Sequence, residues 1–201
     1  KKSDTTSNTA LDEQQRDMMT SVFKSQIPAM EKSDFLVMFE PVGATAQPIV
    51  ITQNEFMRRM KDMAAIQSGM AFYGELPDSY NLIVNTDHPL SQKVIADTES
   101  ACKSELTPIL DELKTVNEEI ERLQEAKKDK KDDEIPVADK EALKHAEEKA
   151  KELRAKESDI LKTYADRTPL VRQLVDLALL SNNMLKGEAL SKFIKRSVEM
   201  L

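Results

Sequence analysis

The most constraining feature of this 201-residue sequence is a run of apolar residues separated by alternating steps of four and three. The run consists of Ile109, Leu113, Val116, Ile120 and Leu123, and mostly charged or polar residues fill the positions between them. This heptad spacing predicts a helix whose single apolar stripe packs along a second helix. A second seam follows Pro136 and consists of Leu143, Ala146, Ala150, Leu153, Ile160 and Tyr164. Together the two seams predict an antiparallel coiled-coil hairpin over residues 99–165.

A small body of helices and strands is predicted before the hairpin. Apolar residues at helical spacing indicate a helix over residues 11–27, which Pro28 ends. Runs rich in β-branched and aromatic residues indicate three strands, at residues 35–39, 48–52 and 80–85. A further helix is expected to start near Glu55, because Thr52 followed by Glu55 has the order of a capping box.

Two strongly apolar helices are predicted at the C-terminal end. Thr168 and Pro169 suit the N-cap and first position of one helix, and Gly187 marks the break before the second. Their apolar surface exceeds what a small sheet can cover, and a second copy of the same helices is the simplest cover. We therefore expect a homodimer that is held by a four-helix bundle. The expected dimer interface comprises Leu170, Leu174, Leu177, Ala178, Leu180, Met184, Leu190, Phe193, Ile194 and Leu201.

These elements together predict an α+β fold in which the hairpin is inserted into a small three-stranded body. Residues 1–9 are interpreted as a polar linker or tail, residues 10–98 as the α/β body and residues 99–165 as the hairpin. Residues 166–201 are the dimerisation helices that complete the α/β domain. Because the sequence opens on Lys1 rather than on methionine, we expect it to be part of a longer protein.

The charge balance argues against nucleic acid and membrane partners. The 29 Lys and Arg residues against 36 Asp and Glu residues leave a net charge of −7, which does not favour phosphate backbones or anionic lipid. The densest apolar stretch, residues 170–180, is too short to span a bilayer and is interrupted by polar residues. The single cysteine, Cys102, cannot form an internal disulfide, which indicates a reducing, cytoplasmic setting.

Few residues could carry catalysis or bind a metal. His145 lies among charged residues on the second arm of the hairpin, which indicates a solvated position, and Asp87 before His88 and Pro89 is typical of a turn that caps a helix. Cys102 has no histidine near it in the sequence, and the four glycines do not form a phosphate-binding loop. We therefore expect no catalytic site, no metal site and no cofactor in this chain.

An apolar stripe on the predicted helix after Glu55 allows two interpretations. The stripe comprises Phe56, Met57, Met60 and Met63, and the other face of the helix is charged. These residues either pack on the sheet as ordinary core residues or form a flexible apolar surface that accepts varied shapes. The residue pattern leaves both interpretations open.

Two stretches resemble the C-terminal domain of the ninety-kilodalton heat-shock chaperone family, especially in its bacterial form. The first is YNLIVNTDHPL at residues 80–90, which ADT follows at residues 96–98. The second is LVDLALL at residues 174–180, with FIKR at residues 193–196 in the helix behind it. Thr86 departs from the family, which commonly has proline there. The chain also ends without the acidic motif of eukaryotic cytosolic relatives, which implies a bacterial protein.

The resemblance implies that this chain is the dimerisation and client-contact part of an ATP-dependent chaperone. ATP and Mg would be bound by a domain outside this chain, so no turnover is expected here. A helix over residues 55–65 matches the position of the family's client-holding helix. The resemblance therefore assigns contact with unfolded or partly folded client proteins to Phe56, Met57, Met60, Met63 and Ala64.

The predicted hairpin lies outside this resemblance, which covers residues 10–98 and 165–201. Relative to the compact domain of the family, the hairpin looks like an insertion, and the resemblance does not explain its use. The alternative function is therefore a structural adaptor in which the coiled-coil hairpin recruits a partner protein and the α/β body only anchors it.

Overall fold

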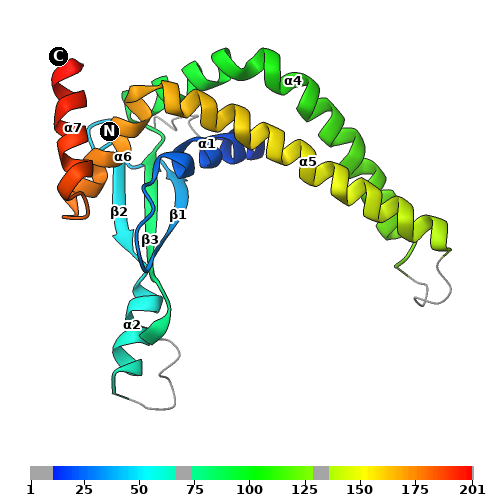
Figure 1. The fold of residues 1–201 in the computed structure, drawn as a ribbon, viewed down its shortest axis with the longest axis horizontal. Helices are drawn as coiled ribbons and strands as arrows, with labels where there is room; N and C mark the ends of the chain where they lie inside the picture. Colours follow the sequence, from blue (N-terminus) through cyan, green and yellow to red (C-terminus); the bar gives the residue numbers. More distant parts are fainter. Residues whose placement is uncertain (1–10, 67–73, 129–135, 201) are drawn as a thin grey trace, which may run out of the picture. The chain divides into compact units, whose positions relative to one another are not determined.

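The structure, a computed structural model, describes residues 11–66, 74–128 and 136–200. Its elements are, in chain order, α1 (Glu13–Gln26), β1 (Ser33–Glu40), β2 (Ile49–Gln53), α2 (Glu55–Ala64), β3 (Asp78–Asn85), α4 (Pro89–Glu125), α5 (Val137–Arg167), α6 (Pro169–Ser181) and α7 (Gly187–Glu199), as Figure 1 shows. The predicted α+β class with a small three-stranded sheet is confirmed.

The chain divides into two compact units. Unit 1 combines Lys1–Asp97 with Ala165–Leu201, and unit 2 is the intervening segment Thr98–Tyr164. Unit 1 is therefore discontinuous in sequence, because its last two helices follow the whole of unit 2.

The sheet of unit 1 has the strand order β1-β3-β2, with β3 in the centre. Strand β1 is parallel to β3, and β2 is antiparallel to it. The register places Val37 and Ile51 on either side of Leu82, and all three side chains are buried. Since side chains on a strand alternate between faces, this row marks the face of the sheet that forms the core.

Helices α1 and α6 cover this core. Helix α1 contacts β1 and α6, and α6 also contacts β2. Phe23 of α1 is fully buried and its ring centroid lies 6.4 Å from that of Phe39 on β1. From α6, Val171 and Val175 are fully buried. The first predicted C-terminal helix is thus part of the core of unit 1.

The start of α2 corrects a sequence prediction. Thr52 is not the N-cap, because it belongs to β2, where it pairs with Asn81 of β3. The N-cap is Asn54, whose side-chain oxygen accepts a hydrogen bond from the backbone N–H of Met57 at 3.2 Å. Strand pairing extends β2 to Gln53, so the helix can begin only after it.

The break between the last two helices also differs from the prediction. Gly187 does not end α6, which stops at Ser181, but is the first residue of α7. The connection contains Asn183 at φ 56°, and Gly187 itself has φ 58°. Both residue types tolerate this left-handed conformation better than most others do.

In unit 2, α4 and α5 run side by side in opposite directions (Figure 1). Their buried contact consists of residues from both predicted seams, namely Leu113, Val116, Ala146, Ala150 and Leu153, with Ile109 and Ile120 half-buried against them. An ion pair at 2.6 Å between Lys149 and Glu112 joins the two helices beside this contact. Pro108 lies inside α4, where it removes one backbone hydrogen-bond donor.

Candidate functional site

Helix α2 lies against the rest of unit 1 without burying any of its own residues. It contacts β3. Two polar contacts anchor it: Lys61 Nζ lies 2.6 Å from Asp78 Oδ1, and the backbone N–H of Asn54 donates to the carbonyl oxygen of Ser79 at 2.8 Å. The helix is therefore held at one end of β3 mainly by polar groups, and its apolar side chains remain at least partly accessible.

The five predicted client-binding residues divide into two groups. Phe56 and Met63 are 64% and 40% exposed, whereas Met57, Met60 and Ala64 are half-buried. Ile66, just beyond the helix, is 85% exposed and was not predicted, although it lies three residues after Met63. We call Phe56, Met63 and Ile66 the α2 strip.

The charged residues of α2 form ion pairs with one another within the helix. Arg58 and Arg59 both form ion pairs with Glu55, and Arg58 also lies 3.6 Å from Asp62. These side chains are exposed, so the pairs stabilise the helix only slightly. Helix α2 thus offers an apolar strip to solvent beside a charged face that is already paired.

The ten residues that were predicted to form the dimer interface differ widely in exposure. Leu174 and Ala178 are buried within the chain, and Leu177 and Ile194 are 44% and 53% exposed. The half-buried members are Leu170, Leu180, Met184, Leu190 and Phe193, and Leu201 lies outside the described residues.

Two further apolar residues, one in the last helix and one at its C-cap, are exposed and were not predicted to be in the interface. Val198 is 67% exposed and Met200 is 48% exposed. Val198 follows Ile194 by four residues, a spacing that could have identified it, because residues four apart share a helix face. We call Leu177, Ile194, Val198 and Met200 the C-terminal strip.

A buried carboxylate joins α6 to α7. Asp176 is 1% exposed, and its Oδ2 accepts hydrogen bonds from Arg172 Nε at 3.1 Å and from Arg196 Nη2 at 2.5 Å. Arg172 also donates to the backbone oxygen of Gln26 on α1 at 2.8 Å. Asp176 therefore links three helices, a role that its place in an apolar sequence run did not predict.

The turn of the sequence resemblance has a structural role. Asn85 is fully buried, and its Oδ1 accepts hydrogen bonds from the backbone N–H groups of Val42 and Asp87. Asp87 Oδ2 in turn accepts a hydrogen bond from the backbone N–H of Gly43 at 3.0 Å. His88 accepts a hydrogen bond at Nδ1 from the backbone N–H of Leu90. These contacts fix the β1–β2 connection to the end of β3.

Cys102 is 3% exposed in unit 2. Burial, reinforced by the nearby Glu105 carboxylate, raises the pKa of the thiol, so little reactive thiolate is present at neutral pH. Among the described residues, no group of three or more His, Cys, Asp and Glu side chains could hold a metal ion. No described helix has the length and apolar character needed to cross a membrane.

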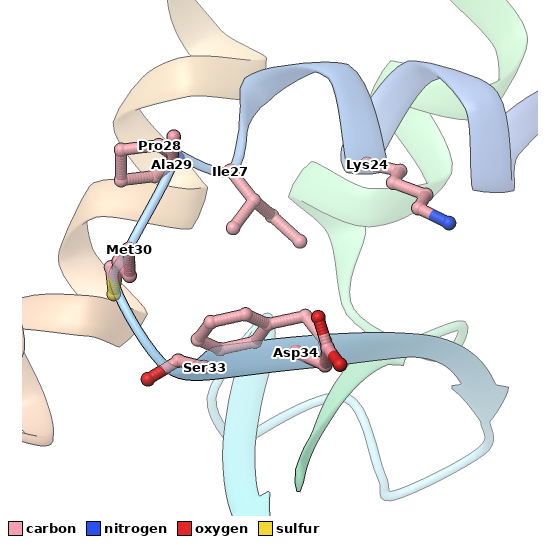
Figure 2. A pocket seen from close by; sticks show the side chains of 8 residues that line it. Lys24, Ile27, Pro28, Ala29, Met30, Ser33 and Asp34 are labelled. Carbon is pink, nitrogen blue, oxygen red and sulfur yellow. The ribbon is translucent and has the colours of Figure 1, made fainter. Parts of the chain in front are cut away.

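A pocket of about 400 Å³ lies between the end of α1 and the start of β1. Figure 2 shows Ile27 pointing from the end of α1 toward the strand, with Pro28 and Met30 on the connecting segment. Lys24 and Asp34 also line this pocket. None of the predicted site residues contributes to it.

Comparisons with known proteins give clear relatives. The chain is 46% identical over 194 residues to the chaperone protein HtpG of Bacteroides thetaiotaomicron, 47% identical over 191 residues to that of Bacteroides fragilis, and 44% identical over 191 residues to that of Porphyromonas gingivalis. These matches cover 95–96% of this chain, so they include most of unit 2. The chain spans 28% of the length of these relatives. No protein-family model and no solved structure matches it.

The matched region extends across both units of a chain whose α+β architecture was predicted from its sequence pattern. Over nearly its whole length, the chain therefore matches the C-terminal domain of the HtpG chaperones, which is a domain of the ninety-kilodalton heat-shock family.

Proposed function

We propose that this chain is the homodimerisation and client-contact module of an ATP-dependent chaperone that binds unfolded or partly folded proteins. The observation that carries the proposal is the distribution of the exposed apolar side chains over the surface. Of the eleven large apolar side chains exposed in the described residues, three form the α2 strip and four form the C-terminal strip. Concentrated apolar exposure marks surfaces that bind other polypeptides.

The α2 strip is the client-contact surface. Phe56 and Met63 lie seven residues apart, so they occupy the same face of α2. A thioether and an aromatic ring adapt to many apolar shapes, which suits a surface that holds varied segments. The paired charges beside the strip limit the contact to a narrow band and keep the helix soluble between clients.

The C-terminal strip is the dimer contact. Helix α7 buries no residue within the chain, yet it carries exposed Ile194 and Val198, and Met200 at its C-cap is exposed as well. Helix α6 adds Leu177, while its buried side anchors the pair in the core of unit 1. A second copy presents the same strip, and such self-complementary contacts are the usual basis of two-fold dimers.

ATP binding and hydrolysis, with Mg²⁺, belong to the part of the protein that lies outside this chain. The support is that the chain spans 28% of relatives named as HtpG chaperones. This chain contributes no catalytic group to that reaction and holds the two protomers together. A bacterial cytoplasmic location accords with the single, buried cysteine.

The adaptor alternative lacks comparable support. In the described part of unit 2, Val137 is the one large apolar side chain that is exposed. The other large apolar residues described in unit 2 are buried or half-buried, and seven apolar residues make up the contact between its two helices.

The test of the proposal is the mass of the 201-residue chain in sedimentation equilibrium at micromolar concentration. We expect a dimer. Ile194→Ser with Val198→Ser should raise the dimer dissociation constant by roughly 100-fold, because four apolar side chains per dimer are removed from the contact. The matched control is Lys192→Ser with Lys195→Ser on the charged side of the same helix, which should change it less than about threefold. A monomeric parent chain would refute the proposal.

A further inference from the structure

Polar contacts, rather than a buried apolar face, hold α7 on α6. Phe193 and Leu190 of α7 are only half-buried. Arg196 Nη2 donates to Asp176 Oδ2, and Arg196 Nε donates to Gln173 Oε1 at 2.9 Å. Gln173 Nε2 donates to Ser197 Oγ at 2.6 Å. The orientation of α7 on α6 therefore depends on a few directional bonds.

Asp176 is the centre of this network. Its side chain is 1% exposed, and its Oδ1 accepts no hydrogen bond from any described residue. Both of its ionic partners, Arg172 and Arg196, reach Oδ2. A buried carboxylate is tolerated only where cations compensate it, so separating Arg196 from Asp176 is unfavourable even though Arg172 stays in place.

The two arginines have different functions. Arg172 lies on the same helix as Asp176 and also binds the backbone of Gln26, so it ties α6 to α1. Arg196 is the charged group that α7 contributes. The planar guanidinium of Arg196 bonds Asp176 and Gln173 at the same time, which fixes direction as well as distance.

We propose that the Arg196–Asp176 ion pair fixes the orientation of α7 on α6 and thereby determines the single register in which two copies of these helices associate. The inference rests on the proposed homodimer. The C-terminal strip combines Leu177 of α6 with Ile194 and Val198 of α7. Only a fixed angle between the helices keeps these side chains in one self-complementary surface, so Arg196 and Asp176 are positioning residues for the interface.

The proposal is tested by Arg196→Met, which keeps the length and apolar stem of the side chain and removes the guanidinium. The matched control is Lys195→Met, because Lys195 is 81% exposed and its ion pair with Glu199 spans 4.0 Å. Sedimentation gives the dimer dissociation constant. A spin label at Lys192→Cys, with Cys102→Ala, gives the distance distribution between protomers. Lys192 is suitable because its side chain is 69% exposed.

We expect a single narrow distance peak for the parent chain and for Lys195→Met. Arg196→Met should broaden or split the peak and raise the dissociation constant by about tenfold or more. Arg196→Lys should have a smaller effect on the peak width and on the dissociation constant, because the positive charge is kept but the double contact with Asp176 and Gln173 is lost. Circular dichroism and the melting temperature show whether unit 1 remains folded. We expect unit 1 to remain folded in Arg196→Met, because Arg172 continues to compensate the Asp176 carboxylate.

The outcomes separate this inference from the proposed function. A monomeric parent chain overturns both. A dimeric parent for which Arg196→Met leaves the peak width and the dissociation constant unchanged overturns the ion-pair inference alone.

Discussion

Lys61 of α2 lies 2.6 Å from Asp78 at the start of β3, and this ion pair joins the predicted client-binding helix to the sheet. The Lys61 side chain is 22% exposed and that of Asp78 is 40% exposed. The pair is better shielded than the ion pairs within α2, whose side chains are 46–72% exposed. It is therefore the charged contact of α2 that affects how firmly the helix is held.

Lys61→Met should loosen α2 without unfolding unit 1. A partly exposed pair contributes about 0.5–1 kcal/mol, so protection of the α2 backbone amides against hydrogen exchange should fall roughly two- to fivefold. Hydrogen exchange with mass spectrometry measures this change. Arg59→Met, which removes an exposed pair within the helix, is the control and should leave protection nearly unchanged. Equal loss of protection in both variants would show that the contact to Asp78 has no special role.

Replacing the two members of the α2 strip that lie within the helix should weaken client capture. We expect Phe56→Ser with Met63→Ser to reduce affinity for reduced, carboxymethylated α-lactalbumin about 10- to 100-fold, because two large apolar side chains no longer become buried. Met60 is left in place since it is half-buried and supports the helix. Fluorescence anisotropy of the labelled client gives the dissociation constant.

The control for client capture removes two exposed apolar side chains elsewhere. Leu36 is 59% exposed and Val42 is 46% exposed, and neither belongs to α2. Leu36→Ser with Val42→Ser should leave the affinity within about threefold of the parent value. If the two double variants weaken binding equally, general surface hydrophobicity rather than α2 holds the client.

The ion pair between the helices of unit 2 predicts a pH effect. The hydrogen bond and positive charge of Lys149 lower the pKa of Glu112 below its ordinary value. A lowered folded-state pKa means that this stabilisation is complete above the unfolded-state pKa of the glutamate. It is lost as the pH falls through the lowered folded-state pKa. Carbon-detected NMR titration of the Glu112 carboxyl group should therefore give a midpoint below that of an unfolded peptide.

Lys149→Met should move this midpoint back toward the ordinary value. Lys151→Met, at an exposed position on the same helix, should leave it unchanged. An unaltered Glu112 midpoint in the Lys149 variant would contradict the contact between the helices.

Periodicity predicted the helices and strands because it records which side of each element is buried. The seam residues Leu113, Val116 and Leu153 illustrate this, since all three are buried in the contact between α4 and α5. Helix ends were harder to predict because they depend on distant partners. Thr52 has the local features of an N-cap, but its pairing with Asn81 keeps it in a strand.

The sequence predicted which helices carry the candidate surfaces, but it did not predict which of their apolar residues are exposed. Leu174 and Leu177 are both apolar residues of α6, yet the first is buried and the second is 44% exposed. Only the packing of α6 on β2 and α1 distinguishes them. Asp176 shows the same limit, because nothing in its apolar sequence neighbourhood specifies partners as distant as Arg196.

The split of unit 1 into two sequence segments has a consequence during translation. The ribosome completes β3 well before it reaches α6, because all of unit 2 is made in between. At roughly 5–20 residues per second, the nascent sheet waits for seconds without the helix that supplies Val171 and Val175 to its core. For that interval, the newly made sheet of this chain leaves apolar core residues such as Leu82 uncovered.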